Sequence, residues 1–108
     1  MEEGVELQNS VDVKRTIIGK GSHIHSGFIG DSIIGENVRI GANFITANRR
    51  LDRQNIYAKI KGVRVDTHST FFGSLIGDNV SIGIHCVTNP GVIIPAGTRI
   101  LPGTIIKG

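Results

Sequence analysis

A six-residue spacing of aliphatic side chains is the feature that most constrains what this chain can fold into. An aliphatic residue followed by glycine or proline recurs along the sequence: Ile18, Ile29, Ile34, Ile40, Ile76, Ile82 and Ile94. Four residues after most of them stands a small or β-branched residue, with Phe44 as the oversized member: Ser22, Val38, Phe44, Val80, Cys86 and Thr98. Each unit predicts one short strand, three strands complete a triangular coil, and coils stack about 4.8 Å apart.

The repeat predicts an all-β fold with a narrow interior. The aliphatic residue points inward, the small residue fits beside it, and the glycine accepts corner backbone angles that a side chain would oppose. Crossover connections between parallel strands are right-handed in almost all proteins. The left-handed parallel β-helix that we expect is therefore implied by the resemblance of this repeat to hexapeptide-repeat proteins, and not by general rules of chain handedness.

The repeat is interrupted once. We expect a single domain, 1–108, of about four coils, with coil blocks at 18–46 and 75–108 and an excursion loop at 47–74 that lacks the pattern. Residues 56–65 alternate apolar and polar side chains around Lys61 and Gly62, which predicts a hairpin. Loops that leave a rigid solenoid are favoured places for ligand contacts. So few coils leave apolar sides exposed, which predicts self-association.

Composition narrows the class of protein. The 108 residues suit one domain, and 15 glycines, about twice the usual share of ~7%, indicate many turns. The single Cys86 excludes an internal disulfide, and no apolar run approaches the ~20 residues of a membrane span. The acidic start is unlike a signal peptide, so we expect a cytoplasmic protein without membrane contact. The net charge of +3, without stacking aromatic residues among the basic ones, argues against nucleic acid.

The basic residues are unevenly distributed. Six of the twelve lysines and arginines lie in one short stretch: Arg49, Arg50, Arg53, Lys59, Lys61 and Arg64. Guanidinium groups pair bidentately with phosphate, so this cluster fits the phosphates of a ligand. It equally fits solvated loop charge, and the sequence leaves the two interpretations open.

The segments 25–38 and 41–48, HSGFIGDSIIGENV and GANFITAN, resemble the acetyltransferase half of the bifunctional sugar-1-phosphate nucleotidyltransferases. These are the bacterial N-acetylglucosamine-1-phosphate uridyltransferase and its archaeal relatives. The resemblance continues through 61–67, 76–80, 83–84 and 90–92 and so covers nearly the whole chain. It implies acetyl transfer from acetyl-CoA to an amino-sugar phosphate such as glucosamine 1-phosphate, by a homotrimer. Nothing in these 108 residues resembles the nucleotidyltransferase half.

The resemblance assigns roles residue by residue. His25 falls on the family's general base, a role that suits imidazole because it titrates near neutrality. Asn48 matches an asparagine that contacts the substrate, and Phe28 and Arg39 fall on two further acceptor positions. Asn43, Ser81 and Arg99 are candidates for holding CoA along the coil edge.

Several positions depart from the family pattern. Phe28 stands where relatives have a tyrosine, Arg39 where they have an asparagine, and Asn43 where a glycine is usual. Residues 68–73, HSTFFG, replace a basic Gly-Arg-Arg-Lys run. These departures keep a second hypothesis open, namely a non-catalytic module that trimerises a nucleotidyltransferase.

Each of these residues also fits a purely structural role, and a metal enzyme is a third hypothesis for the function of the chain. His25 fits a surface histidine, Asn48 a turn residue, and Phe28 and Phe44 simple filling of the coil. A zinc enzyme of the γ-carbonic-anhydrase kind uses the same coil, and four histidines supply enough imidazole in number: His23, His25, His68 and His85. Their spacing gives no recognisable ligand set, so we expect no metal site.

Overall fold

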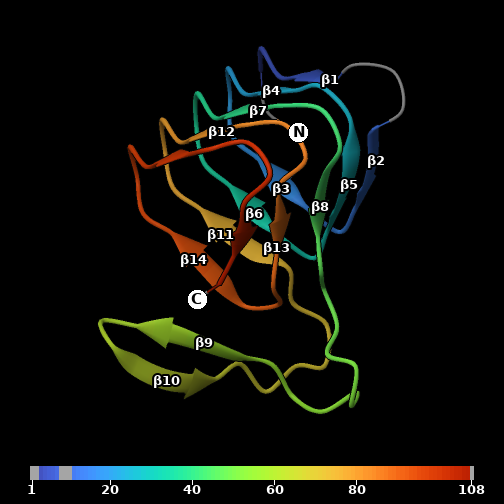
Figure 1. Cartoon of the computed structure of the whole chain (residues 1–108), viewed down its shortest axis with the longest axis vertical. Helices are drawn as coiled ribbons and strands as arrows, with labels where there is room; N and C mark the ends of the chain where they lie inside the picture. Colours follow the sequence, from blue (N-terminus) through green and yellow to red (C-terminus); the bar gives the residue numbers. More distant parts are fainter. Residues whose placement is uncertain (1–2, 8–10, 108) are drawn as a thin grey trace.

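The fold class predicted from the repeat is confirmed. The computed structural model describes residues 3–7 and 11–107, and within them it contains strands, turns and loops but no helix. Parallel strands stack in three sheets that wrap into a left-handed β-helix of about five turns (Figure 1). Across the part of the chain that is described, no helix is long and apolar enough to cross a membrane.

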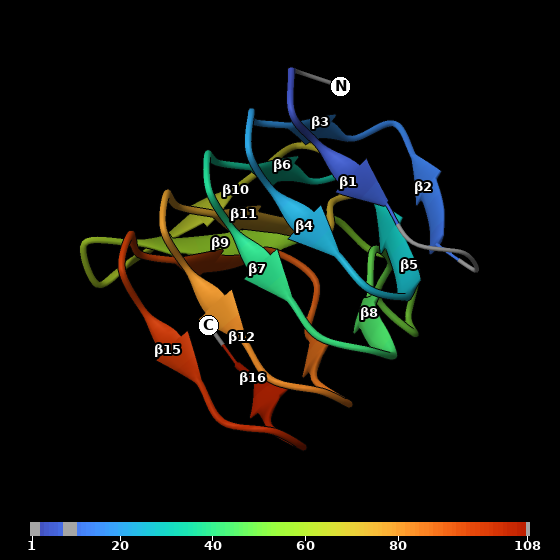
Figure 2. The same cartoon turned by 90° about the horizontal axis from the view of Figure 1, so that it is seen from above.

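Each of the first four turns contributes one strand to each of three sheets, and the fifth contributes β15 and β16 to the first and second sheets (Figure 2). The first sheet has the order β1 (Glu6–Leu7), β4 (His23–Ile24), β7 (Arg39–Ile40), β12 (Ser81–Ile82) and β15 (Arg99–Ile100). The second sheet has the order β2 (Val11–Lys14), β5 (Gly27–Gly30), β8 (Phe44–Thr46), β13 (Val87–Thr88) and β16 (Ile105–Ile106). The third sheet has the order β3 (Ile17–Ile18), β6 (Ile33–Ile34), β11 (Ser74–Ile76) and β14 (Val92–Ile94).

Three corners join the sheets in every complete turn. The chain passes from the first sheet to the second at what we call the first corner, from the second to the third at the second corner, and back to the first at the third corner. At the first corner, the segment between the inner Ile40 and Phe44 is three residues long, as it is between Ile82 and Cys86.

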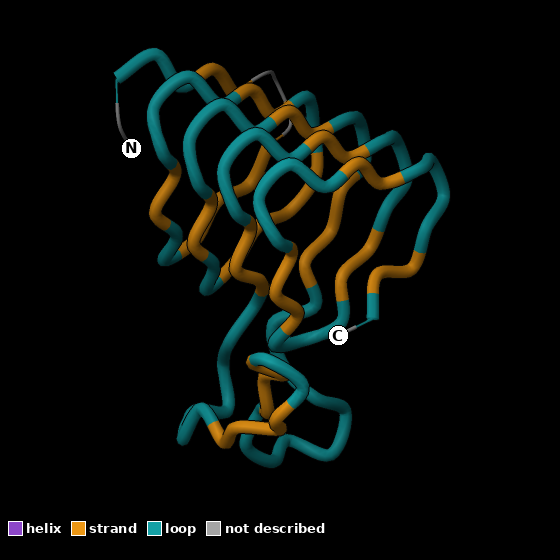
Figure 3. Tube along the Cα trace, turned by 90° about the vertical axis from the view of Figure 1, so that its left-hand side faces the viewer, coloured by secondary structure: helices purple, strands orange, loops and turns teal. Residues whose placement is uncertain are grey.

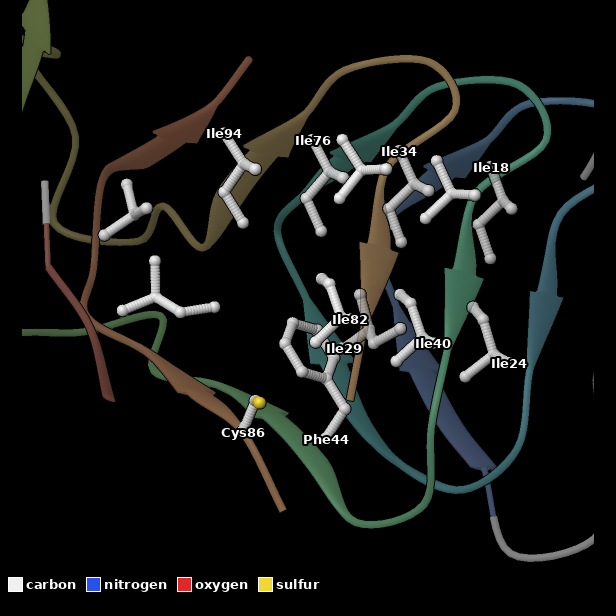
Figure 4. Close-up of a cluster of buried hydrophobic side chains, with 14 residues drawn as sticks. Ile18, Ile24, Ile29, Ile34, Ile40, Phe44, Ile76, Ile82, Cys86 and Ile94 are labelled. Carbon is white, nitrogen blue, oxygen red and sulfur yellow. The ribbon is translucent and has the colours of Figure 1, made fainter. Parts of the chain in front are cut away.

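The core is a stack of isoleucines that extends along the coil axis (Figure 4). Ile18, Ile34, Ile76 and Ile94 are hydrogen-bonding neighbours on the third sheet and form one buried row. Ile24, Ile40 and Ile82 form a second row on the first sheet. Burying one such side chain contributes about 1.5–3 kcal/mol.

The oversized Phe44 fits because its neighbour in the preceding turn is a glycine. Phe44 is fully buried, whereas Phe28 is only half-buried and lies outside the prism. Gly27 pairs with Phe44 across the sheet with a φ of 133°, and a Cβ there would collide with the Phe44 backbone. Phe44 therefore fills the interior as predicted, and the same interpretation is wrong for Phe28.

The glycines that follow the inner isoleucines serve close stacking, which corrects the expectation that they supply unusual backbone angles. A Cβ on Gly19 would lie 2.6 Å from the Gly35 carbonyl carbon, and one on Gly77 would lie 2.5 Å from the Ala96 nitrogen. The left-handed backbone angles occur two residues later, at Gly21, Asn37 and at the stacked positions of later turns. Asparagine and glycine tolerate these angles best.

The sequence predicted about four coils, and the structure has about five turns. The additional turn precedes Ile18: β1 pairs with β4, β2 with β5, and β3 with β6. Its inner positions before Ile18 are valines and a leucine without the aliphatic-glycine signature, which explains why the repeat did not reveal it. Residues 1–2 and 8–10 of this segment lie outside the described residues.

The excursion leaves the coil at the second corner of the third turn (Figure 3). It lies between β8 and β11, so Ser74, which the sequence assigned to the excursion, is the first residue of a coil strand. Within it, β9 (Tyr57–Ile60) and β10 (Val63–Asp66) form an antiparallel hairpin around Lys61 and Gly62.

The three sheets carry different side chains on their outer faces. The first sheet presents a polar ladder: Glu6, His23, Arg39, Ser81 and Arg99. The third sheet presents an aliphatic ladder: Ile17, Ile33, Leu75 and Ile93. The second sheet is apolar after its first member: Asp12, Phe28, Ile45, Val87 and Ile105.

Candidate functional site

A shallow groove of about 660 Å³ lies along the polar face of the first sheet. Its lining includes four predicted site residues, His25, Arg39, Ser81 and Arg99, together with His23. Arg39, Ser81 and Arg99 are stacked neighbours in register, so their Cα atoms are separated by about 4.8 Å at each step. The groove thus has an apolar floor of strand residues and a row of hydrogen-bond donors along it.

His25 lies at a first corner that is a residue short. Only His25 and Ser26 separate the inner Ile24 from Gly27, whereas the next turn has three residues between Ile40 and Phe44. Because the preceding turn is shorter here, it offers the Asn43 amide no backbone carbonyl in the usual stacked position. The amide donates instead to the Ser26 Oγ at 2.8 Å. In the following turn, the His85 amide donates to a backbone carbonyl, that of Ala42, also at 2.8 Å.

The short corner leaves the His25 ring accessible. His25 is exposed, and no hydrogen bond or ion pair joins its ring to any of residues 3–7 and 11–107. The positions stacked next to it in the following turns are Gly41 and Gly83, which have no side chains to cover it. A group bound in the groove can therefore reach the imidazole from the side of the later turns.

Asn43, predicted to contact CoA, lies at the same corner but outside the groove lining. Its backbone has a φ of 60°, and its Nδ2 is 3.4 Å from the His85 Nδ1. The side chain lies at the rim of the corner, one residue beyond Ala42.

A second cluster of predicted residues lies at the second corner, where Asp31 is the central group. Arg15 donates two hydrogen bonds to the Asp31 carboxylate, one of them 3.0 Å from Nη2 to Oδ2. The Asn48 Nδ2 donates to the same Oδ2 at 2.9 Å. The Arg15 hydrogen bonds lower the pKa of Asp31 from its ordinary value; partial burial opposes them, and the Asn48 hydrogen bond adds to the lowering. The carboxylate is thereby kept ionised.

Phe28 and Asn48 meet above Gly30. A Cβ on Gly30 would lie 2.7 Å from the Phe28 Cζ and 2.8 Å from the Asn48 Nδ2, so this glycine provides the space that both groups occupy. Because one Asn48 N–H points to Asp31, the amide is held in one orientation with its carbonyl oxygen directed elsewhere. The sequence paired Phe28 with Asn48 as acceptor contacts, and the structure brings these two side chains together.

The structure does not bring His25 together with Asn48. His25 precedes β5 and Asp31, the partner of Asn48, follows it, so the four residues of β5 lie between them, about 13 Å at ~3.3 Å per residue. The seven predicted site residues therefore divide into a group at the groove and first corner and a pair at the second corner. Within one chain, a single sugar ring does not bridge the two groups.

Sequence reasoning missed Asp31 and Arg15 as members of the site. Arg15 and Asp31 are 16 residues apart in the sequence. The same separation relates Ile17 to its strand partner Ile33, so it corresponds to one turn of the coil at this point. A sequence analysis that used this 16-residue turn would have placed the Arg15 and Asp31 side chains next to each other. Phe71 lies close by as well: the Arg49 guanidinium is 4.6 Å and that of Arg15 5.8 Å from its ring centroid.

The four histidines do not form a metal site within one copy. His23 Nδ1 is 3.2 Å from Glu6 Oε2, His85 contacts Asn43, and His68 lies near Asp66 on the excursion. No group of three His, Cys, Asp or Glu side chains that could hold a metal ion occurs in the described ranges. The carbonic-anhydrase hypothesis thus gains no ligand set from a single chain.

Comparison with known proteins supports the resemblance. No family model matches the chain. It is 40% identical over 91% of its length to the "Bifunctional sugar-1-phosphate nucleotidylyltransferase/acetyltransferase" of Sulfurisphaera tokodaii, and 42% identical over 97% to the "Bifunctional protein GlmU" of Methanococcus aeolicus. The protein of that name from Methanocaldococcus jannaschii is 44% identical over 83%. The chain spans about a quarter of the length of these relatives, 25%, 26% and 22%, at their carboxyl-terminal end. The predicted resemblance is confirmed.

Proposed function

From its homology to the carboxyl-terminal segment of bifunctional sugar-1-phosphate nucleotidylyltransferase/acetyltransferases, we propose that this chain is an acetyl-CoA-dependent N-acetyltransferase domain. Its acceptor is an amino-sugar phosphate such as glucosamine 1-phosphate, and its role is in nucleotide-sugar biosynthesis. The observation that carries the proposal is identity of 40% over 91% of the chain to a relative whose name includes acetyltransferase. The position of His25 beside an open groove supports it.

In this proposal His25 acts as the general base. The acceptor amine attacks the thioester carbonyl carbon, the bond from that carbon to sulfur breaks, and the electron pair leaves on sulfur. His25 removes the proton from the amine nitrogen, and that proton returns to the thiolate, so that an N-acetyl sugar phosphate and free CoA thiol result. General-base catalysis of this kind contributes typically ~10²- to 10⁴-fold.

The groove on the first sheet suits the acyl donor. Ser81 and Arg99 follow Arg39 along the polar ladder, and the glycines beside His25 leave backbone groups accessible. Arg99 would pair with a CoA phosphate, because guanidinium groups bind phosphate bidentately. Asn43 would contact the donor from the corner, and Arg39, in register with His23, would contact the acceptor close to His25.

We place the complete site between neighbouring copies of a homotrimer. His25 of one copy and the Phe28–Asn48 pair of the next would then meet around one acceptor, which their separation within a chain does not allow. The aliphatic outer ladders support self-association, because Ile17 is 62% exposed, Ile33 48%, Ile45 46% and Ile105 62%. Contiguous apolar surface of this kind is typically covered by a partner. We also propose a cytoplasmic location, since Cys86 has no second cysteine with which to pair.

A non-catalytic trimerisation module is the second candidate function. Two observations favour it: no carboxylate among the described residues orients the His25 ring, and Phe28 offers no hydroxyl group at the acceptor pair. Such a module would keep the apolar ladders and bind no CoA.

A thiol-release assay with acetyl-CoA distinguishes the two candidates. The purified chain is supplied with glucosamine 1-phosphate, with galactosamine 1-phosphate, or with no acceptor. The transferase proposal predicts CoA release that depends on the acceptor and is faster with one of the sugars. Absence of release from a folded oligomer, together with no CoA binding by calorimetry at millimolar ligand, would favour the structural module.

A further inference from the structure

A second groove lies at the second corner of the coil, between the coil and the hairpin of the excursion. One hollow of about 640 Å³ is lined by Arg49, Arg50 and Arg64, and an adjoining one of about 380 Å³ by Lys59 and Arg64. Both include Tyr57, Asn89 and Pro90, so they form one continuous cleft, which we call the hairpin cleft. Four of the six clustered basic residues line it, whereas Arg53 and Lys61 do not.

Two of these cations face each other directly. Lys59 and Arg64 are paired residues of the antiparallel hairpin, so their side chains lie on the same face. Like charges directly opposite destabilise a hairpin, and no carboxylate in the described residues forms an ion pair with either. The Arg64 guanidinium is stacked 3.8 Å from the Tyr57 ring centroid, which holds its planar face and leaves its N–H groups at the cleft.

Arg49 also lacks a neutralising partner in the described part of the chain. Its Nε is buried without a hydrogen bond, and its guanidinium is held by stacking on Phe71. The contrast is Arg50, whose Nη2 is 2.6 Å from an Asp52 carboxylate oxygen. Burying a donor without a partner costs about 1–3 kcal/mol, more when the group is charged. Within residues 3–7 and 11–107, three cations around this cleft therefore lack a counter-charge.

Hydrogen bonds within the excursion close the base of the hairpin, and its first strand packs against the coil at Gly91. Ile56 is buried, its amide donates to the Ser69 carbonyl at 2.8 Å, and the Thr67 amide donates to the Ile56 carbonyl at 3.0 Å. Gly91 has a φ of 82°, and a Cβ there would lie 2.4 Å from the Tyr57 carbonyl oxygen. The coil thus has a glycine where the hairpin backbone comes closest to it.

We propose that the hairpin cleft binds a phosphoanion of at least two negative charges, a diphosphate or a phosphate monoester, on Arg49, Arg64 and Lys59. The bound anion neutralises the opposed Lys59–Arg64 pair and supplies acceptors to the guanidinium N–H groups at the cleft. This inference does not rest on acetyl transfer, because it uses none of the groups at the His25 groove.

The test uses inorganic pyrophosphate as the probe, by calorimetry at constant ionic strength and without acyl donor. We expect the Arg64→Gln variant to bind pyrophosphate about ten- to a hundredfold more weakly than the wild type, the loss of one charged hydrogen-bonding group. Without ligand, the same variant should unfold at an equal or higher temperature, because the substitution relieves repulsion with Lys59. Arg53→Gln, which removes one charge from the excursion outside the cleft, is the matched control and should bind as the wild type does.

Three results would overturn the proposal: no pyrophosphate binding by the wild type, equal binding by Arg64→Gln, or equal loss in Arg53→Gln. The natural source of the phosphate follows from two further titrations. Weaker CoA binding by Arg64→Gln, absent with dephospho-CoA, identifies the CoA phosphate, and weaker binding of glucosamine 1-phosphate identifies the sugar phosphate. His25→Ala should retain pyrophosphate binding, so a failure of the transferase proposal is distinguishable from a failure of this one.

Discussion

The outer faces of the coil are built on the same inner frame and yet differ in chemistry. Inside, every sheet contributes buried isoleucine, valine or small residues in register, with Phe44 as the one large aromatic member among the described residues. Outside, the first sheet carries a polar ladder that ends in Arg99, whereas the third carries the aliphatic ladder from Ile17 to Ile93. The inner positions therefore specify the fold, and the outer positions are free to specify ligand binding on one face and association on another.

The contrast also explains where the chain departs from the repeat. The shortened corner places His25 at the edge of the polar face, and the excursion leaves from the opposite edge of the second sheet. A regular coil in either place would continue the stack without adding an accessible imidazole or a basic cleft. Substitutions at inner positions should therefore lower stability, and substitutions at outer positions should change catalysis or association.

The largest effect is expected for Phe44→Ala, an inner substitution. Truncating a fully buried phenylalanine costs about 3–5 kcal/mol of unfolding free energy, through lost burial and the cavity left behind. Denaturant unfolding measures it. Leu101→Ala, at an outer position that is 77% exposed and lies on none of the apolar ladders, is the control and should cost about 1 kcal/mol or less, as substitutions outside a core commonly do. Equal losses for the two variants would contradict the division between inner and outer residues.

His25→Ala is expected to lower acetyl transfer by about 10²- to 10⁴-fold, the usual contribution of a general base. The side chain is exposed, so melting temperature and oligomeric state should stay unchanged. Acceptor-dependent thiol release measures the rate, and His68→Ala, an exposed histidine on the excursion that has no part in the proposed site, is the matched control. Full activity in His25→Ala would remove this residue from the proposed role.

Ile33→Lys is expected to disrupt assembly of the copies. It places a charge in the middle of the aliphatic ladder on the third sheet, at a position that is 48% exposed in the single chain. Burying an unpaired lysine in an interface is costly, so analytical ultracentrifugation should show a shift toward monomer. Ser81→Lys on the polar face is the control and should keep the assembly. An unchanged oligomer in Ile33→Lys would place the interface elsewhere.

The smallest effect is expected for Asp31→Asn. Because the folded pKa of Asp31 lies below its unfolded value near 3.8, its stabilising contribution is present above that value and is lost as pH falls through the folded pKa. The variant should be less stable than the wild type at neutral pH by about 1 kcal/mol, because the Arg15 partner of the ion pair is 63% exposed and its charge is largely solvated. The two proteins should converge in acid. Asp12→Asn controls for loss of one outer carboxylate, and a pH-independent difference for Asp31→Asn would argue against the ion pair with Arg15.

The fold was accessible from the sequence because its inner positions are repetitive. The spacing of Ile18, Ile34 and Ile76 indicated buried rows, and the alternation around Lys61 and Gly62 indicated the hairpin. The first turn was not accessible, since Val11 and Val13 fill the same interior without a following glycine. A coil tolerates such replacements wherever the chain can still pass the neighbouring turn.

The site was accessible only in parts. The motif around His25 indicated the residue, but the grouping of Arg39 with Ser81 and Arg99 depends on the register between successive turns, which the excursion between β8 and β11 obscures. The separation of His25 from Asn48 depends on β5 lying between them. Such relations arise from stacking of turns, and a residue-by-residue resemblance does not contain them.

The most direct test of the account is complementation between His25→Ala and Asn48→Ala in mixed trimers. Each variant alone should be nearly inactive. When the two are coexpressed in equal amounts, about one quarter of the interfaces should combine an intact His25 from one copy with an intact Asn48 from its neighbour, since each is present at half of the positions. The account predicts recovery of about one quarter of wild-type acetyl transfer. Activity no greater than that of the separate variants would show that both residues act within one chain, or not at all, and would contradict a site built between copies.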